Sequence, residues 1–385
     1  MGLSLSERSG WMMQSGIRTM SIACKNHNGI DLSQGDSDLE APLPVREGAK
    51  SAIDSGSNTY TDLEGIRELR EQIAIKLRRH VGLEVDPQSE IIVSAGVSGA
   101  LYSALLALLN PGDEMVVFEP YYEYHLTMLR ATGVHPVFLK TAAPDWRFSV
   151  EELERVVTPR TRAILVNTPA NPSGKVFNRS ELEDIATLAV RHDLFVFTDE
   201  IYEYFVYDDN THLTPALLPG MKARTISISG MSKTFSITGW RIGYCICDAR
   251  WSQAIGLFND LIYACAPAPL QMGVAEGLKA LGSDYYQKIC NKYMQRRDNI
   301  CNALSAAGLT PFVPQGGYFV LADISRIDGS NSLDRAMKLL KTCGVACVPG
   351  EAFYHDGSGA GLGRFCFAKE DALIEEACRR IERIK

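Results

Sequence analysis

Residues 227–244 read SISGMSKTFSITGWRIGY, and the chemistry of this stretch is the starting point for interpreting the rest of the chain. The stretch places one lysine, Lys233, among small and hydroxylated residues, and Arg241 follows eight positions later. The amine of a lysine can form an imine with a carbonyl compound. A guanidinium nearby can hold a doubly charged phosphate. Pyridoxal 5'-phosphate (PLP) offers both an aldehyde and a phosphate, so the stretch predicts a PLP site.

Short apolar runs alternate with longer helical patterns through the middle of the chain. Seven of these runs are rich in Val, Ile and Phe and are nearly continuous, which is typical of strands buried on both faces. The order predicts an α/β domain over residues 46–290 with a mostly parallel seven-stranded sheet. The predicted strands are 91–95, 114–118, 135–139, 162–166, 194–198, 225–229 and 242–247, and the predicted helices are 99–109, 121–132, 149–157 and 179–192.

The chain changes character after about residue 290. A long helical pattern leads into short strands and two further helices, which predicts a smaller α+β domain. We expect the first 45 residues to be irregular and to pack against this second domain, which then comprises residues 1–45 and 291–385. The predicted elements are helices 284–307, 332–342 and 369–384 and strands 317–322, 344–348 and 364–368.

The composition excludes several classes of partner. The 385 residues suit two domains, and 46% hydrophobic with 22% charged residues is typical of a soluble globular protein. The net charge is −7 without a basic stripe, so no nucleic-acid partner is expected. No apolar run approaches the length of a membrane helix, and the N-terminus lacks a signal-peptide core. The ten cysteines show no zinc-binding spacing and predict reduced thiols in the cytoplasm, with no metal site.

Polar residues follow three of the predicted strands. Asp199 ends an apolar run, where a carboxylate is costly unless it has a partner, although a helix N-cap is the alternative. Asn171 lies in an N-P-x-G sequence, which alone would indicate only a turn. Lys233 follows the sixth predicted strand. Because ligands of open α/β sheets bind at the carboxyl ends of the strands, we expect these three side chains to lie close together.

A glycine-rich turn lies between the first predicted strand and a helical pattern. Its residues Gly96, Val97 and Ser98 would direct backbone N–H groups and a helix dipole at one point, which suits a phosphate. The turn does not have the G-x-G-x-x-G form, so a dinucleotide site is not expected. Together with Arg241, the turn predicts the phosphate-binding part of the site.

The segment 232–244 has the form S-K-x-F-x-x-x-G-W-R-x-G-Y. It resembles the PLP attachment site of the class I and II aminotransferases, which have the fold called type I of PLP enzymes. The motif is long and specific, and the resemblance extends from about residue 31 to the C-terminus. It implies a fold type I PLP-dependent transferase, with a large PLP-binding domain and a smaller one.

The resemblance also implies roles around the cofactor ring. Asp199 would pair with the pyridinium nitrogen and keep it protonated. Tyr202 and Asn171 would hydrogen-bond the phenolic oxygen of the ring. Tyr122 would stack on the ring, and His125 would support Asp199.

At the phosphate, the resemblance leaves one contact open. The family often has a serine three positions before the lysine, but this chain has Gly230 there, and whether Ser229 or Ser232 replaces it is open. Arg241 would bind the phosphate directly. Tyr60 matches a tyrosine that reaches the phosphate of the neighbouring subunit, which implies a homodimer with shared active sites.

For the substrate, the resemblance implies contacts with Gly35, Asn171 and Arg364. Arg364 would clamp the α-carboxylate, since guanidinium geometry suits a two-point grip. Gly35 resembles the glycine of a mobile N-terminal segment that, in the family, closes over that carboxylate. Aspartate-using relatives often carry an arginine in the segment matching 259–263, which offers no cation here, although other arginines or lysines could serve. Candidates for the side-chain pocket are Trp11, Ile17, Tyr122 and Tyr263.

The implied reaction is amino-group transfer between an amino acid and a 2-oxo acid through a Schiff base on Lys233, whose freed amine would move the Cα proton. A PLP-dependent lyase, cyclase or oxidase with the same fold is the alternative, since the cofactor supplies the same chemistry in each. A non-catalytic regulator of this fold would carry an additional DNA-binding domain. The chain shows no basic helix for one.

Overall fold

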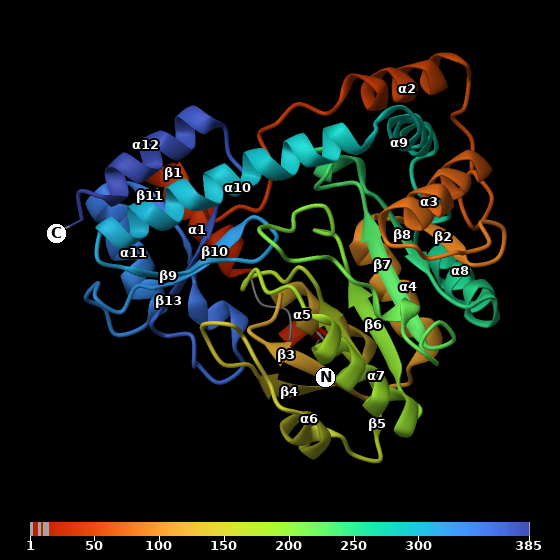
Figure 1. Ribbon diagram of the computed structural model, residues 1–385, viewed down its shortest axis with the longest axis horizontal. Helices are drawn as coiled ribbons and strands as arrows, with labels where there is room; N and C mark the ends of the chain where they lie inside the picture. Colours follow the sequence, from red (N-terminus) through yellow and green to blue (C-terminus); the bar gives the residue numbers. More distant parts are fainter. Residues whose placement is uncertain (1–2, 7–8, 11–14, 385) are drawn as a thin grey trace.

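The computed structural model describes residues 3–6, 9–10 and 15–384 (Figure 1). Its larger part is built on a seven-stranded sheet in the order β2-β8-β7-β6-β5-β3-β4. Only β8 runs antiparallel to its neighbours within this sheet, so the prediction of a mostly parallel seven-stranded sheet is confirmed. The strands are β2 (Ile91–Ala95), β3 (Glu114–Glu119), β4 (His135–Lys140), β5 (Thr161–Asn167), β6 (Phe195–Asp199), β7 (Thr225–Gly230) and β8 (Ile242–Ile246).

Helices cover both faces of this sheet, which explains the continuous apolar runs of its strands. In β5, Leu165 packs into the core on one face and Ile164 into the core on the other. In β6, Phe197 packs into the same core as Leu165, and Val196 packs into the same core as Ile164. The helices are α2 (Leu43–Asp54), α3 (Arg67–His80), α4 (Gly96–Leu108), α5 (Glu123–Thr132), α6 (Val150–Val156), α7 (Arg179–Arg191), α8 (Ala249–Tyr263) and α9 (Ala268–Ala280). The sequence analysis did not predict four of them, which are α2, α3, α8 and α9.

The second part is an antiparallel four-stranded sheet in the order β12-β13-β10-β9. The 24-residue helix α10 (Ser283–Ala306) runs from α9, beside the large sheet, to α12 at the far end of the molecule (Figure 1). The other elements here are β9 (Thr310–Phe312), β10 (Phe319–Asp323), α11 (Ser332–Cys343), β11 (Val345–Ala346), β12 (Val348–Pro349), η4 (Gly350–Phe353), β13 (Leu362–Cys366) and α12 (Asp371–Ile381).

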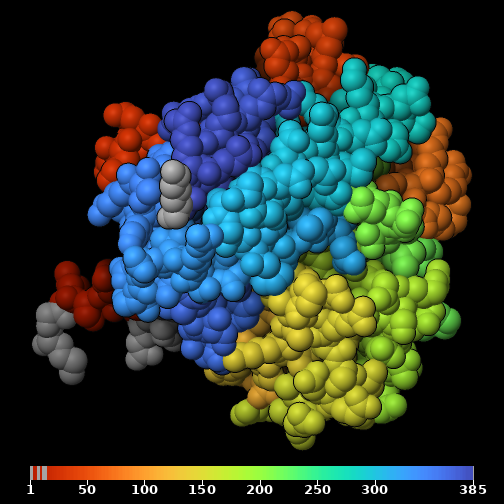
Figure 2. Space-filling model, turned by 60° about the vertical axis from the view of Figure 1, so that its left-hand side comes forward, coloured from red at the N-terminus to blue at the C-terminus, as the bar shows by residue number. Residues whose placement is uncertain are grey.

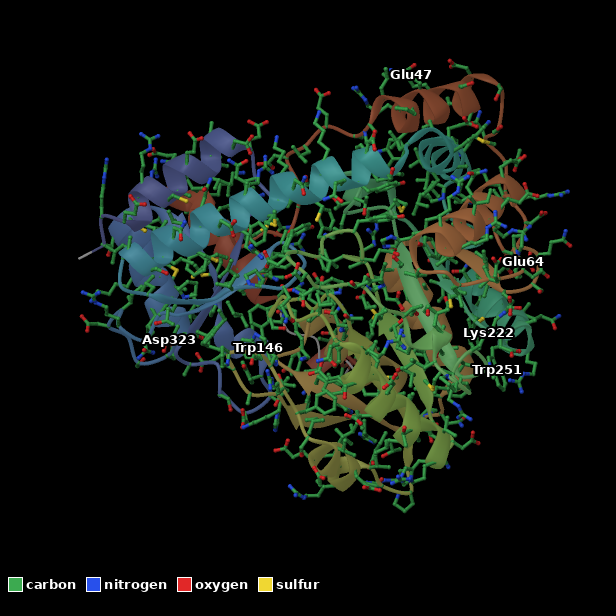
Figure 3. All side chains as sticks on the ribbon, in the orientation of Figure 1. Glu47, Glu64, Trp146, Lys222, Trp251 and Asp323 are labelled. Atoms are coloured by element: carbon green, nitrogen blue, oxygen red, sulfur yellow. The ribbon has the colours of Figure 1, made fainter. Side chains whose placement is uncertain are left out.

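The two parts pack directly against each other. Figure 2 shows the blue C-terminal chain in contact with the yellow segment that follows β4. Trp146, labelled in Figure 3, comes from that segment and is 4% exposed, because it is buried with Leu321, Val348 and Phe353 of the four-stranded part.

The expectation that the first 45 residues are irregular is wrong. They contain helix α1 (Gly16–Asn26) and strand β1 (Ile30–Asp31). Ser15 caps α1 by accepting a hydrogen bond from the backbone of Ile17. Met20 and Cys24 are the buried residues of α1. Strand β1 pairs in parallel with β11, which lies between α11 and β12 in the chain.

Within the described residues, no helix is both long enough and apolar enough to cross a membrane.

Candidate active site

Five of the predicted site residues come together at one edge of the seven-stranded sheet. Asp199 at the end of β6 is the register partner of Asn167 at the end of the neighbouring strand β5. Gly230 at the end of β7 is level with Gly243 near the start of the antiparallel β8. Strand β8 pairs in turn with β2, whose last residue is Ala95. Residues that adjoin these neighbouring strand ends are Gly96, Asn171, Asp199, Lys233 and Arg241.

Lys233 is half-buried, and its amine donates a hydrogen bond to the carbonyl of Gly35 at 2.8 Å. The hydroxyl of Tyr318 donates to the same carbonyl at 2.9 Å. Burial is the largest cause that lowers the pKa of Lys233 to about 8, and the positive charges of Arg364 and Arg241 lower it further. A substantial fraction of this amine is therefore neutral, and nucleophilic, near physiological pH.

Asp199 is a buried carboxylate with a defined partner. Its Oδ2 lies 2.9 Å from Nε2 of His125, which is the contact that the family resemblance implied. Its Oδ1 accepts a weaker hydrogen bond from the backbone of Ile201 at 3.3 Å. The ring of Tyr122 meets His125 edge-on at 5.3 Å between centroids. This packing fixes the imidazole, and the imidazole in turn orients the carboxylate.

Tyr202 lies three residues after Asp199 and is buried. Burial raises the pKa of its hydroxyl far above the ordinary value, so the group is a neutral hydrogen-bond donor. It faces the same cavity as Asn171.

The glycine-rich turn forms the first turn of α4, so this helix begins three residues earlier than predicted. Gly96 has φ +73°, and a Cβ there would lie 2.5 Å from Nη2 of Arg241. Arg241 is itself left-handed, with φ +58°. The N-cap residue is Ala95, whose side chain cannot accept a hydrogen bond, so the N–H groups of Val97 and Ser98 remain available to an anion. The helix terminus and the guanidinium together have the chemistry of a phosphate site.

Packing explains why a glycine stands three positions before Lys233. A Cβ on Gly230 would lie 2.9 Å from the Cα of Gly243, so no larger residue fits there. The hydroxyl of Ser229 donates to Glu203 at 2.6 Å. The hydroxyl of Ser232 donates to a β8 carbonyl at 3.3 Å. In this structure both hydroxyls therefore have partners within the protein.

Arg364, on β13, is fully buried where the two parts of the molecule meet. Its Nη1 donates to Oδ1 of Asn171 at 2.8 Å, and its Nη2 donates to the carbonyl of Ser33 at 2.5 Å. The guanidinium lies 4.2 Å from the ring centre of Phe319. Among the described residues, its Nε has no hydrogen-bond partner. A buried cation with spare donor capacity fits a carboxylate ligand.

A cavity of about 650 Å³ opens onto these groups. Ile17 lines it, as predicted. Tyr60 lies elsewhere and is 83% exposed. Tyr263 also lies elsewhere, at the start of α4, where its hydroxyl accepts a hydrogen bond from the backbone of Ala95 at 3.1 Å. Trp11 is outside the described residues. The predicted site residues that line the cavity are Gly35, Tyr122, Asn171, Tyr202, Lys233 and Arg364.

Sequence reasoning missed two groups of residues at this site. Tyr318 holds the Gly35 carbonyl and packs edge-on against Tyr202 at 4.9 Å. The aromatic pair Tyr318–Phe319 in a predicted strand was the available signal. The second group is one face of α1, and its residues on the cavity wall are Arg18, Ser21, Ile22 and Lys25.

A buried ion pair supports the loop behind the site. Glu203, directly after Tyr202, pairs with Lys76 of α3, whose amine also donates to the hydroxyl of Tyr244 at 3.0 Å. Nε2 of His80 lies 3.8 Å from the same carboxylate. Burial raises the pKa of Glu203, but the charges of Lys76 and nearby histidines outweigh it and hold the pKa at about 2. This network fixes the chain segment that positions Tyr202.

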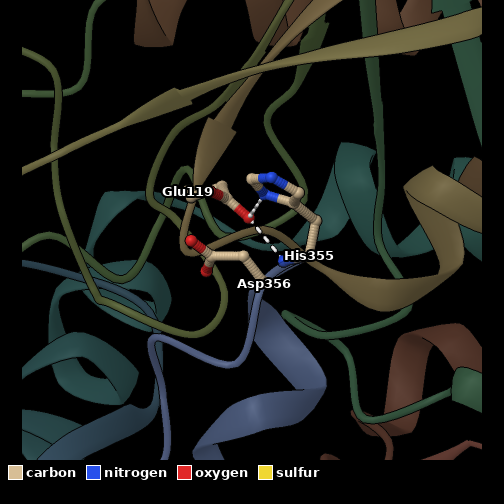
Figure 4. A group of neighbouring side chains, drawn as sticks. All are labelled: Glu119, His355 and Asp356. Carbon is tan, nitrogen blue, oxygen red and sulfur yellow. Dashed lines mark hydrogen bonds and ion pairs between the residues drawn. The ribbon is translucent and has the colours of Figure 1, made fainter.

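Figure 4 shows a second polar group, at the end of β3. His355 donates its backbone N–H to Oε1 of Glu119 at 2.7 Å, and its Nδ1 lies 3.0 Å from the same oxygen. Asp356 lies close enough for the three side chains to share an ion, but the ammonium of Lys140 already supplies a positive charge to it. The ring of His355 stacks on Phe138 at 4.2 Å. The group therefore acts as a polar contact between the large sheet and the four-stranded part.

Comparison with known proteins identifies the family. The family described as Aminotransferase class I and II matches residues 27–381. The chain belongs to the class I and II aminotransferases.

It is 33% identical to aromatic-amino-acid aminotransferase 2 of Thermococcus litoralis over 99% of this chain and 98% of that one. It is 34% identical to an aspartate aminotransferase of Pyrococcus abyssi over the same shares. The structure of N-succinyldiaminopimelate aminotransferase from Mycobacterium tuberculosis matches with a TM-score of 0.95 and 32% identity, covering 99% of this chain and 100% of that one.

The protein is therefore an enzyme that transfers amino groups, and its fold is type I. The alternatives of a lyase, a cyclase, an oxidase or a non-catalytic regulator receive no support from these relatives.

Proposed function

We propose that this aminotransferase holds PLP on Lys233 and moves an amino group between an amino acid and a 2-oxo acid. The observation that carries the proposal is the amine of Lys233, with its pKa of about 8, in the cavity that Arg364 also lines. The structure fits PLP at both ends, because the α4 terminus with Arg241 suits the phosphate and Asp199 with His125 suits a protonated ring nitrogen.

The proposed cofactor contacts extend to the groups between these two ends. Tyr202 and Asn171 would hydrogen-bond the phenolic oxygen, and Tyr122 would cover the ring face. The residues proposed to hold PLP are Tyr60 of the partner subunit, Gly96, Val97, Ser98, Tyr122, Asn171, Asp199, Tyr202, Lys233 and Arg241.

When bound, PLP supplies an electron sink that makes the α-proton of an amino acid easier to remove. Arg364, joined by Asn171 and the backbone around Gly35, binds the α-carboxylate and fixes the orientation of the substrate. The neutral Nζ of Lys233 would remove the proton from Cα and would deliver it to the cofactor, so that the substrate leaves without its amino group. Nε2 of His125, 2.9 Å from Oδ2 of Asp199, holds this carboxylate in position for the ring nitrogen. Lys233, Asp199 and Tyr202 are therefore the proposed catalytic residues.

A single half-turnover tests the reaction class. Mixed with an amino acid and no acceptor, the loaded enzyme should release one equivalent of 2-oxo acid per site and then stop. A lyase would continue past one equivalent. Lys233→Ala should bind PLP without a bond that borohydride can reduce, and a reducible bond in that variant would contradict the assignment.

The surface that carries Tyr60 supports a homodimer with shared sites. Tyr60 is 83% exposed, and Leu257 and Leu261 on the neighbouring α8 are 56% and 77% exposed. Gly256 of α8 packs against Leu63 of the Tyr60 loop, so these apolar side chains belong to one surface. Monomers rarely leave such a patch uncovered.

Subunit mixing tests the shared sites. A dimer of one Lys233→Ala subunit and one Tyr60→Ala subunit contains one site with both residues intact, if Tyr60 acts across the interface. Mixing the two impaired variants should then restore activity, and no gain on mixing would place Tyr60 outside the partner's site.

We further propose that residues 46–290 form the large domain, that residues 1–45 and 291–385 form the small one, and that the protein works in the cytoplasm. All ten cysteines are free thiols, which suits a reducing compartment.

A further inference from the structure

We propose that a second cavity of this protein binds a planar aromatic acid. The cavity has a volume of about 650 Å³ and lies between helix α3, the loop that follows β6 and the start of α10. None of its lining residues lines the active-site cavity. One loop contributes to both cavities, because Glu203 lines the second cavity and directly follows Tyr202, which lines the first. The inference goes beyond the proposed function, since it concerns another ligand at another place.

The first observation is a column of four aromatic rings on the wall of this second cavity. The ring of Tyr204 stacks on the rings of Tyr286 and His80, with 4.2 Å between centroids in each case. The rings of His80 and His212 are parallel to within 11°, with 6.1 Å between their centroids. All four side chains line the cavity. A wall of this kind suits a flat aromatic ligand, because aromatic pairs are stabilised beyond the burial of their apolar area.

The second observation is that the protein already holds this wall in place. Nε2 of His212 lies 2.9 Å from Oε2 of Glu200, which fixes one end of the column. The buried pair of Lys76 and Glu203 fixes the chain next to Tyr204. A ligand would therefore bind without first ordering these side chains, which lowers the entropic cost of binding. The apolar part of the wall consists of Ile75, Val206, Leu278 and Leu281.

The third observation is the balance of charge around the second cavity. The buried Lys76–Glu203 pair is neutral as a whole, and Asp208 pairs with Arg297 at 2.6 Å. Burial is the largest cause that lowers the pKa of His80 to about 4, so this ring is neutral at physiological pH. Arg79 also lines the cavity, is exposed, and forms no ion pair with another residue in the described ranges.

The free charge on the lining is therefore the guanidinium of Arg79, whose planar shape matches the two oxygens of a carboxylate. The start of helix α10 adds to this positive potential. Gly282 and Ser283 line the cavity, and Gly282 is an N-cap without a side chain to accept from the first N–H groups. Aromatic walls with a cation at the rim select a ligand that has an aromatic body and a carboxylate.

Equilibrium binding of benzimidazole-5-carboxylate tests the inference without turnover. Titrated into the PLP-loaded enzyme by calorimetry, this acid should bind at least about tenfold more tightly than cyclohexanecarboxylate, which has no aromatic ring. It should bind about threefold more tightly than the uncharged benzimidazole-5-carboxamide, since an exposed ion pair contributes modestly. Arg79→Gln should abolish the preference for the acid over the carboxamide. Arg78→Gln, at the neighbouring exposed position outside the cavity lining, is the matched control and should keep that preference.

Two variants test the place of binding. A Cβ on Gly282 would meet no atom within 4 Å, and φ is −90° there, so Gly282→Trp adds bulk at the cavity without a clash or backbone strain. Gly282→Trp should lower the affinity for the acid by about tenfold or more while the far-UV ellipticity stays that of the wild type. Tyr286→Leu removes one ring of the column and should lower the affinity for the acid by at least about threefold.

Three outcomes would overturn the inference. One is equal binding of the aromatic acid and cyclohexanecarboxylate, or of the acid and its carboxamide, by the wild type. The second is unchanged binding of the acid in both Gly282→Trp and Tyr286→Leu. The third is a loss of binding in Arg364→Lys that neither of those two variants shows, because it would place the acid in the active-site cavity.

Discussion

The ion pair of Lys76 and Glu203 makes a quantitative prediction about stability. Glu203→Gln removes the charge that the buried ammonium requires. The fall of the Glu203 pKa from an ordinary value of 4.5 to about 2 corresponds to about 3 kcal/mol of stabilisation at neutral pH. Removal of one partner of a buried pair typically costs about 3–5 kcal/mol, so the two magnitudes agree. We expect Glu203→Gln to lower the free energy of unfolding by about 3 kcal/mol at pH 7.

The pH dependence follows from the direction of the shift. The pKa of Glu203 is lower in the folded protein than in the unfolded chain, so the ionised carboxylate stabilises the fold fully when the pH is above about 4.5. This stabilisation is lost as the pH falls from about 4.5 towards 2. At pH 3.5 the difference between wild type and Glu203→Gln should therefore be roughly 1 kcal/mol smaller than at pH 7. Lys76→Met combined with Glu203→Leu leaves no buried charge and should recover at least half of the loss.

Urea denaturation of the ligand-free protein, at one fixed concentration and followed by both ellipticity and tryptophan fluorescence, measures these differences. Glu375→Gln, on the exposed face of α12, is the matched control and should stay within about 0.5 kcal/mol of wild type. A loss below about 1 kcal/mol for Glu203→Gln, or the same loss at pH 7 and pH 3.5, would refute the reasoning.

Three further variants test other parts of the structure. Arg241→Gln should lower the affinity for PLP by about tenfold or more in fluorescence titrations, but should leave the affinity for pyridoxal, which has no phosphate, unchanged. An equal loss of affinity for both ligands would show that Arg241 does not bind the phosphate. His355→Ala removes the imidazole contact of the buried Glu119 carboxylate and leaves it only the backbone N–H of residue 355, so the protein should be destabilised by about 1–3 kcal/mol. His135→Ala, on an exposed position, should not destabilise the protein, and equal denaturation midpoints for the two variants would contradict this. Leu261→Asp places a charge on the exposed α8 surface and should shift the protein to monomers in sedimentation velocity, and an unchanged sedimentation coefficient would argue against that interface.

The parts of the site that follow strand ends were predictable from the sequence. Asp199, Asn171 and Lys233 each come after an apolar run, and parallel strands bring their carboxyl ends to one edge. The seven strands were found within a residue or two because their burial on both faces leaves continuous apolar runs.

The contacts that complete the cavity were not predictable, because they join distant segments. The Gly35 carbonyl meets Lys233 across 198 residues and Tyr318 across 283, and no local spacing encodes such a pairing. The cationic face of α1 was missed for a different reason. Arg18, Ser21 and Lys25 look in the sequence like any solvent-facing side of a helix, and only the fold places them on the cavity wall.

Helix α10 has a mechanical consequence. Its 24 residues span about 36 Å as one unbroken rod from α9 to the far end of the four-stranded part. Any swing of that part must therefore turn at the ends of the rod, since bending it would break backbone hydrogen bonds. The distance between spin labels at its two ends should stay constant through a catalytic cycle. The distance between two labels placed on opposite sides of the cavity should change.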